Sequence, residues 1–417
     1  MRSGSPMTPK NIVVCCDGTG QKLDARRTNV VRLYRVLDRS DPGQQVDFYH
    51  AGIGTLPAAG ALTSATRTLS RWAGILGGYG LLDIVAKAYG FIVDHYRPDD
   101  RIYLVGFSRG ALAVRLVGGL LHRFGVLRPG AKHLIPNALE LYERHYTHIA
   151  NPKQRCQARE LDQEFRTLFC MPGGVRIRFL GVWDTVKAFG IFRPRSFPHL
   201  RHNESIESVC HAVALDERRR SFMFTSWGGL RGFVEKGPPP GQTVKEVWFA
   251  GVHSDVGGGY PEAESGLSWH SFRWMVGEAR LAGLRFEDKQ LAAVLDAAGE
   301  RAMRLGEHFF QFHESRTLGW RLLDVLPRRE LKNAPERPIP GSGAGLSNAD
   351  EPADSDLPVP LGWPKRPRTW WPISGRRDIN ANRREGALLL HRSVEPYLKA
   401  GRYHVEDFAF VDDSPVG

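Results

Sequence analysis

The chain has 417 residues, of which 42% are hydrophobic and 24% charged, enough to bury a large core in one large or two ordinary domains. No run approaches eighteen uncharged apolar residues and residues 1–10 lack the apolar core of a signal peptide, so neither a membrane-spanning helix nor Sec-dependent export is expected. The excess of 57 Lys and Arg over 45 Asp and Glu gives a net charge of +12, which favours anionic partners such as lipid headgroups, nucleic acid or acidic metabolites.

The five cysteines form no C-x-x-C pair and are odd in number, which indicates a reducing compartment. We therefore expect synthesis in the cytoplasm and any export by a route other than Sec. No cofactor is predicted.

The first elements alternate between strand and helix. The apolar residues 11–16 predict a buried strand, Thr28 is expected to cap a helix, and residues 45–50 predict a second strand. Residues 57–80 are rich in Gly, Ala, Thr and Leu with poor periodicity, which makes them a candidate lid. A helix is predicted over residues 81–98.

Residues 101–124, RIYLVGFSRGALAVRLVGGLLHRF, combine a strand, a tight turn and an apolar helix. The turn GFSRG is the G-x-S-x-G pattern of a nucleophile elbow, which requires this strand-turn-helix context. Glycines on both sides of Ser108 avoid the clash that a Cβ would cause, so the hydroxyl can stand clear of the sheet. The sequence therefore predicts a nucleophilic serine.

The second half continues the alternation. Residues 137–150 and 158–169 are predicted polar-faced helices of an insertion, and residues 204–216 are also interpreted as helical. Strong strands are predicted over residues 175–183 and 244–252, and further helices over residues 267–281 and 289–298. Such alternation builds a mostly parallel sheet with helices on both faces, an α/β-hydrolase-like fold with inserted lid-like segments.

The domain organisation follows from composition. We expect a disordered leader, one α/β-hydrolase domain with a helical insertion, a Pro- and Gly-rich basic-aromatic excursion, and a C-terminal helix packing back on the main domain before a frayed tail. These parts cover residues 1–10, 11–332 (insertion 125–174), 333–380 and 381–417.

Three strand ends deliver Ser108, Asp184 and His253 in the chain order of α/β-hydrolases. In parallel sheets the functional residues lie at the carboxyl ends of strands, so these side chains can converge there. His253 would take the proton from Ser108, and Asp184 would orient His253.

Two alternatives stay open. Asp255, two residues beyond His253, is a rival acid in a glycine-rich loop. Alternatively Asp17, Asp184 and Asp255 with His253 could bind a divalent metal for phosphoester hydrolysis, although that arrangement leaves the GFSRG turn without a purpose.

The oxyanion hole is predicted to use the backbone N–H of Arg109 and a second N–H from Gly18 or Thr19. Asp17 would place a carboxylate beside a developing oxyanion, and an ion pair with the Arg109 side chain would offset that repulsion.

Two stretches interleave cations with aromatic residues, at 187–202 and 361–384. Such composition suits an anionic membrane surface or single-stranded nucleic acid, but equally a solvated loop with locally buried rings. His313 and His391 are interpreted as structural residues within helical patterns.

Several segments resemble one family, the bacterial and fungal α/β-hydrolase domains that include type VI secretion phospholipase effectors. The matching segments, in order, are CCDGTG, TNVVRL, AGIGT, VGFSRGALAVR, FLGVWDTV, HAVALDERRRSF and WFAGVHSDVGGGYPE, with HRSV from His391 as an outlying match. The resemblance implies a serine esterase of phospholipase A type, with Ser108 as nucleophile and the acid and histidine among Asp184, His253 and Asp255.

The expected activity is hydrolysis of acyl esters through an acyl-serine intermediate, with a glycerophospholipid as leading substrate. The expected partners are a lipid or other acyl ester and an anionic membrane surface, with nucleic acid disfavoured. A soluble carboxylesterase, or an inactive hydrolase fold that binds anionic membranes or nucleic acid, are the alternatives.

Overall fold

The computed structural model describes residues 8–18, 27–52, 79–144, 149, 151–186, 197–219, 225–227, 238–306, 310–315, 328–329, 369–370, 388–403, 405 and 408–414. The greater part of the expected leader, of the candidate lid at 57–80, of the excursion at 333–380 and of the two basic-aromatic stretches lies outside these residues. Residues 8–10, 79–80, 197–202 and 369–370 of these segments are described. Among the described helices, none combines the length and the apolar character needed to cross a bilayer.

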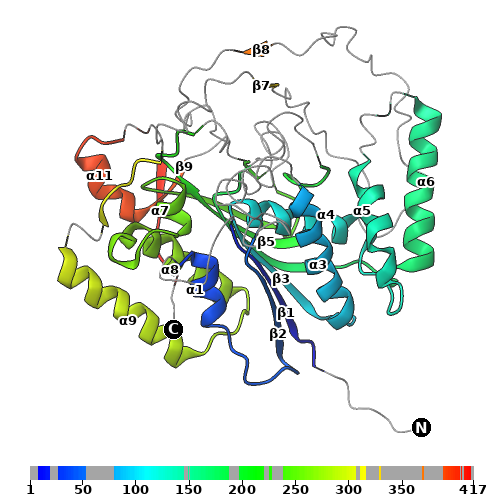
Figure 1. Cartoon of the computed structure of the whole chain (residues 1–417), viewed down its shortest axis with the longest axis horizontal. Helices are drawn as coiled ribbons and strands as arrows, with labels where there is room; N and C mark the ends of the chain where they lie inside the picture. The colour runs from blue at the N-terminus through cyan, green and yellow to red at the C-terminus, as the bar shows by residue number, and fades with distance from the viewer. Residues whose placement is uncertain are drawn as a thin grey trace, which may run out of the picture.

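One eight-stranded sheet, parallel throughout, forms the centre of the molecule, in the order β10-β9-β6-β5-β4-β3-β1-β2 (Figure 1). This is the α/β architecture that the alternating pattern predicts. Its strands are β1 Asn11–Cys16, β2 Gln45–His50, β3 Arg101–Phe107, β4 Ile177–Trp183, β5 Ile206–Ala214, β6 Thr243–Phe249, β9 Leu388–His391 and β10 Phe408–Val411, and a separate antiparallel pair joins β7 Arg328–Arg329 to β8 Thr369–Trp370.

Helices cover both faces of the sheet, and successive residues of β1 supply two different cores. Ile12 and Val14 pack with the residues of α3 and α4, whereas Val13 and Cys15 pack with those of α1, α8 and α9. Each face therefore receives every second side chain of a strand. The α-helices are α1 Asn29–Arg35, α3 Tyr79–His95, α4 Arg109–Phe124, α5 Ile135–Glu143, α6 Pro152–Phe169, α7 His253–Gly257, α8 Gly266–Leu281, α9 Asp288–Leu305 and α11 Glu395–Lys399, with 3₁₀ helices η1 Lys132–Leu134, η4 Glu262–Glu264 and η6 Arg392–Val394.

The helix expected over residues 204–216 is wrong, because most of that stretch forms the central strand β5. Its core-forming half, VCHAVA, is wholly buried, since helices cover the sheet on both faces. An apolar run buried on both sides has no alternation by which a strand could be distinguished from a buried helix.

The C-terminal region also differs from the prediction. Instead of one long helix, it contributes strand β9, followed by η6 and the five-residue α11. The tail expected to fray forms the edge strand β10, and beyond it Asp412 pairs with Arg392 while Asp413 accepts a hydrogen bond from His391 at 3.1 Å. The C-terminal residues therefore extend the sheet beyond β6.

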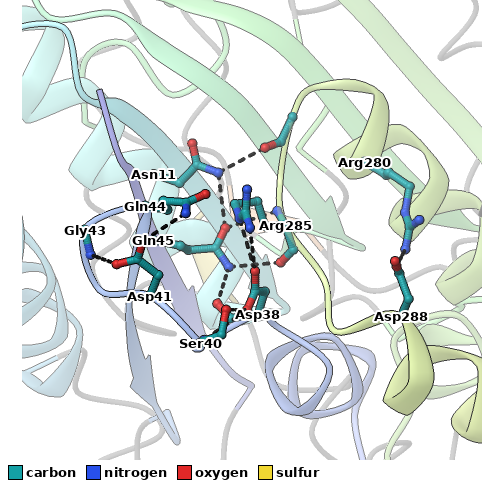
Figure 2. A network of polar contacts seen from close by, with 11 residues as sticks. Asn11, Asp38, Ser40, Asp41, Gly43, Gln44, Gln45, Arg280, Arg285 and Asp288 are labelled. Carbon is teal, nitrogen blue, oxygen red and sulfur yellow. Dashed lines mark hydrogen bonds and ion pairs between the residues drawn. The ribbon is translucent and has the colours of Figure 1, made fainter. Parts of the chain in front are cut away.

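A polar network fastens the amino ends of β1 and β2 to the loop after α8 (Figure 2). The Asn11 side-chain amide donates to Gln45 Oε1 at 3.1 Å and to the Gly283 carbonyl at 3.0 Å. The Gln45 amide in turn donates to the carbonyls of Asp38 and Arg285, both at 2.9 Å. These contacts lie at the end of the sheet opposite to the carboxyl ends of its strands.

Strand register brings Ser108 and Asp184 together. Phe107 at the end of β3 is the register partner of Trp183 at the end of β4, and Trp183 pairs with Ala212 of β5. The residues that follow Phe107 and Trp183 therefore leave the sheet side by side at its carboxyl edge.

Candidate active site

Ser108 occupies a strained turn between β3 and α4. Its backbone has φ 59° and ψ −120°, in the region that favours glycine, as expected for a nucleophile elbow. A Cβ on Gly106 would lie 2.7 Å from the Gly110 carbonyl oxygen, and one on Gly110 would lie 2.1 Å from the Cys16 carbonyl oxygen. Both glycines of the G-x-S-x-G pattern are therefore required by close backbone approach.

The side chains of Ser108, His253 and Asp184 form one hydrogen-bonded series. His253 Nε2 lies 2.8 Å from Ser108 Oγ, and His253 Nδ1 lies 2.5 Å from Asp184 Oδ2. All three residues are buried, Asp184 completely. The aromatic ring of Phe107 packs against the imidazole, with ring centroids 4.6 Å apart.

The second oxygen of Asp184 is held by the backbone. Asp184 Oδ1 accepts a hydrogen bond from the N–H of Ala214 at 3.0 Å, which fixes the carboxylate while Oδ2 faces His253. The Asp184 backbone has φ 38°, a left-handed conformation that aspartate tolerates better than most residues.

Asp255 is directed elsewhere. Its Oδ1 lies 2.6 Å from His313 Nδ1, and its Oδ2 accepts the N–H of Val252 at 3.0 Å. The rival acid is thus engaged with a different histidine, and the imidazole of His253 contacts Asp184. His313 lies in the irregular segment 310–315, not in a helix.

The protonation state of His253 follows from its surroundings. Burial lowers the pKa of His253 below its ordinary value, and the hydrogen bond and negative charge of Asp184 oppose that shift without cancelling it. The imidazole is therefore neutral at pH 7, the form that can accept a proton.

Glu217 is a further buried group at the site that the sequence did not single out. Its Oε2 accepts the backbone N–H of His253 at 3.3 Å and the Arg219 guanidinium at 2.9 Å. Burial would raise the pKa of Glu217, but its bonds and ion pair with Arg219 outweigh this and lower it. Glu217 follows the carboxyl end of β5, and the interpretation of β5 as a helix concealed that position.

Asp17 lies at the carboxyl end of β1, and its partners differ from those expected. Its carboxylate accepts hydrogen bonds from Gly18 N–H at 2.6 Å, Thr28 Oγ1 at 2.7 Å and Tyr49 Oη at 3.0 Å. The ion pair suggested between Asp17 and Arg109 is absent from these contacts. Burial raises the pKa of Asp17 to about 6, despite these three donors.

The expected oxyanion-hole residues are partly described. Gly18 lies close to Ser108, since a Cβ on it would be 3.4 Å from Ser108 Cβ, but its N–H donates to Asp17. Burial lowers the pKa of the Arg109 side chain at the start of α4 to about 10. Thr19 lies outside the described residues.

The metal alternative requires the carboxylates to converge, and they do not. Asp17 binds Thr28 and Tyr49, Asp184 binds His253, and Asp255 binds His313. Across the part of the chain that the structure describes, no group of three or more His, Cys, Asp or Glu residues is arranged to hold a metal ion.

A comparison with known families gives one match over most of the chain. The family model described as "T6SS, Phospholipase effector Tle1-like, catalytic domain" matches residues 10–278, well over half of the chain, and spans all three of the hydrogen-bonded residues. The chain belongs to this Tle1-like family. The family resemblance predicted from the sequence is thereby confirmed, and the Tle1-like domain begins at β1 and ends within α8.

Individual relatives match only in part. "Uncharacterized protein YEL023C" of Saccharomyces cerevisiae is 34% identical over 218 residues, 51% of this chain and 32% of the yeast protein. An uncharacterized Pseudomonas aeruginosa protein of known structure is 18% identical, with a TM-score of 0.36 over 67% of this chain and 47% of its own. The Tle1 effector bound to the VgrG spike is 19% identical, with a TM-score of 0.30 over 62% and 52% of the two chains.

Proposed function

We propose that this Tle1-like domain is a serine hydrolase that cleaves acyl esters of glycerophospholipids, releasing a fatty acid and a lysophospholipid. The observation that carries the proposal is the series Ser108 Oγ, His253 Nε2, His253 Nδ1, Asp184 Oδ2, with distances of 2.8 and 2.5 Å, built on a strained strand-to-helix turn. A serine hydroxyl needs such a base to act as a nucleophile at neutral pH.

The first half-reaction forms the acyl-enzyme. Ser108 Oγ attacks the ester carbonyl carbon while its proton passes to His253 Nε2, and the imidazolium so formed is stabilised by the charge of Asp184. When the tetrahedral intermediate collapses, the bond to the lysophospholipid oxygen breaks, and His253 returns the proton to that oxygen.

Water completes the cycle. His253 takes a proton from a water molecule whose oxygen attacks the acyl carbon, and the proton then passes to Ser108 Oγ as the acyl bond breaks. The products of the second half-reaction are a fatty acid and the free serine.

For the oxyanion hole we assign the backbone N–H of Arg109, the residue after the nucleophile, together with a donor from the loop after β1. Among the two expected residues of that loop Thr19 is favoured, because the Gly18 N–H already donates to the carboxylate of Asp17.

A phospholipid substrate is supported by the family and by charge. The matched family is one of phospholipase effectors, and the net charge of +12 favours approach to a surface of anionic lipid headgroups. A serine paired with histidine and aspartate in this way is the arrangement that forms acyl-serine intermediates, which favours cleavage of an acyl ester and hence an A-type specificity.

The test combines active-site labelling with product analysis. A fluorophosphonate probe should label the wild-type protein and not the variant Ser108→Ala. Mixed phosphatidylglycerol and phosphatidylcholine vesicles should yield free fatty acid and lysophospholipid, detected by mass spectrometry. A phosphatidic acid or diacylglycerol product would contradict acyl-ester cleavage. Labelling with hydrolysis of soluble esters alone would identify a carboxylesterase instead.

A further inference from the structure

Two consecutive backbone amides set the position of His253. The N–H of Val252 donates to Asp255 Oδ2 at 3.0 Å, and the N–H of His253 donates to Glu217 Oε2 at 3.3 Å. Asp255 and Glu217 are each 1% exposed. The start of α7, and with it the imidazole of His253, is therefore held by two buried carboxylates from different elements.

Both carboxylates are contacted by one short piece of chain, the 310–315 segment. His313 Nδ1 lies 2.6 Å from Asp255 Oδ1, and the His313 backbone N–H donates to Asp255 Oδ2 at 3.3 Å. Ser315 Oγ donates to Glu217 Oε1 at 3.1 Å. This segment lies beyond residue 278, where the Tle1-like match ends.

The 310–315 segment is itself anchored by packing. The Phe312 ring packs edge-on against Tyr397 of α11 with centroids 4.8 Å apart, and the Arg402 guanidinium lies 3.7 Å above the Phe312 ring. Tyr260 stacks on His313 at a centroid distance of 3.6 Å. The segment therefore links the C-terminal elements to the carboxylates beneath His253.

We propose that His313 and Ser315 are positioning residues for His253: they hold Asp255 and Glu217 in the orientation that fixes the start of α7, and they do so most firmly when His313 carries a proton. The inference rests on the proposed function, because it assigns these residues to the same site.

The environment of His313 supports the protonated form. Burial alone would lower the pKa of His313, but the hydrogen bonds and charges of Asp255 and Glu264 outweigh burial and raise it. Glu264 Oε2 lies 3.5 Å from Nε2, so a carboxylate faces each ring nitrogen. Titratable, charged and polar groups from every neighbouring element surround His313. They are Asp255 of α7, Glu264 of η4, Tyr260 between these two elements, Glu217 and Arg219 after β5, Gln311 and Glu314 of the 310–315 segment, and Tyr397 of α11.

The two histidines then set opposite limits on activity. His253 accepts a proton only when neutral, and its lowered pKa places the acidic limit below the ordinary histidine value. The His313 ion pair is complete below its own raised pKa and is lost as pH rises through it. The rate of hydrolysis should therefore decline as pH rises through the pKa of His313, because the neutral imidazole no longer forms an ion pair with the Asp255 carboxylate.

The experiment compares variants in the full chain across pH 5–9. His313→Phe keeps a ring to stack on Tyr260 but removes both donors, whereas His313→Asn keeps one neutral donor near the position of Nδ1. His133→Asn, on the exposed η1, is the matched control. The readouts are the rate of Ser108 labelling by a fluorophosphonate and the kcat and KM for vesicle hydrolysis.

We expect His313→Phe to lower kcat and the labelling rate by about 10- to 100-fold with KM unchanged, because a small displacement of a base is enough for such a loss. Both His313 variants should lack the alkaline decline, His313→Asn should keep more activity, and His133→Asn should match the wild type. A wild-type profile and rate in His313→Phe would overturn the inference.

Hydrogen exchange of the Val252 and His253 amides separates this inference from the proposed function. His313→Phe and Ser315→Ala should speed exchange of these two amides at least 10-fold while the β1 amides stay protected. If the wild type neither labels nor hydrolyses lipid, the proposed function fails, and exchange still decides whether the segment holds α7. If the wild type is labelled at Ser108 but the two variants leave exchange of the Val252 and His253 amides unchanged, the inference is overturned and the proposed function stands.

Discussion

Asp184 and Ala214 are joined by a hydrogen bond from the Ala214 backbone N–H to Asp184 Oδ1 at 3.0 Å. Ala214 is the last residue of β5, the neighbour of the strand that carries Asp184. The Asp184 carboxylate is thus held by the sheet itself, and its other oxygen contacts His253. This relationship distinguishes Asp184 from Asp255, whose carboxylate belongs to the His313 contact.

Replacing Asp184 with Asn should lower kcat by roughly 10³- to 10⁴-fold with little change in KM, because the amide cannot stabilise the imidazolium of His253. Steady-state hydrolysis of vesicles and fluorophosphonate labelling both measure this loss. Asp255→Asn is the comparison variant and should lower kcat by about 10- to 100-fold. A larger loss in Asp255→Asn than in Asp184→Asn would assign the acid to Asp255.

The acidic side of the pH profile should report His253. Its folded-state pKa is lowered by burial, so the base is neutral and active above that pKa and is lost as pH falls through it. We expect kcat/KM to rise with pH through an inflection below about 6.5, the ordinary histidine value. An inflection above that value would mean that the charge of Asp184 outweighs the burial.

Two glycines of α4 provide a matched pair for the elbow. Gly110→Ala would place a Cβ 2.1 Å from the Cys16 carbonyl oxygen, so at least about 2 kcal/mol of stability should be lost. Gly118→Ala meets its nearest atom at 3.5 Å and should stabilise the helix by about 0.5–1 kcal/mol. Urea unfolding measures both. Equal tolerance of the two substitutions would contradict the close approach of β1 and α4.

The network in Figure 2 should matter for stability and not for activity. Asn11→Ala leaves Gln45 Oε1 and the Gly283 carbonyl without a donor that the wild type supplies, which should cost about 1–3 kcal/mol in the free energy of unfolding. Gln44→Ala removes only an exposed contact with Asp41 and is the control. If Asn11→Ala lowers kcat under conditions where the variant is fully folded, the amino ends of the strands affect the site at their carboxyl ends, and the prediction is wrong.

The sequence was informative where local geometry leaves little choice. The Gly-Ser-Gly turn at Ser108 needs small residues on both sides, and the polar residues Asp184 and His253 stand directly after or close to apolar strands. Chain order and the rule that parallel strands end at one edge were then enough to bring them together.

What the sequence could not provide depends on long-range packing. The stretch VCHAVA is buried on both sides because it is central in the sheet, so its residues show no strand-like alternation, and the sequence does not indicate the position of Glu217 beyond its end. The role of His313 depends on a contact across 58 positions of the chain, for which no local pattern exists.

The position of β9 bears on how fragments of this protein behave. β9 joins the sheet beside β6, where Leu390 pairs with Trp248, and Tyr403 donates to Asp216 at 2.5 Å. A fragment ending at residue 278 lacks β9, so β6 would become an edge strand with unpaired backbone N–H and C=O groups. Strands from other chains can pair with such an edge. Such a fragment should therefore self-associate on purification, even though it contains every residue of the proposed hydrolytic series.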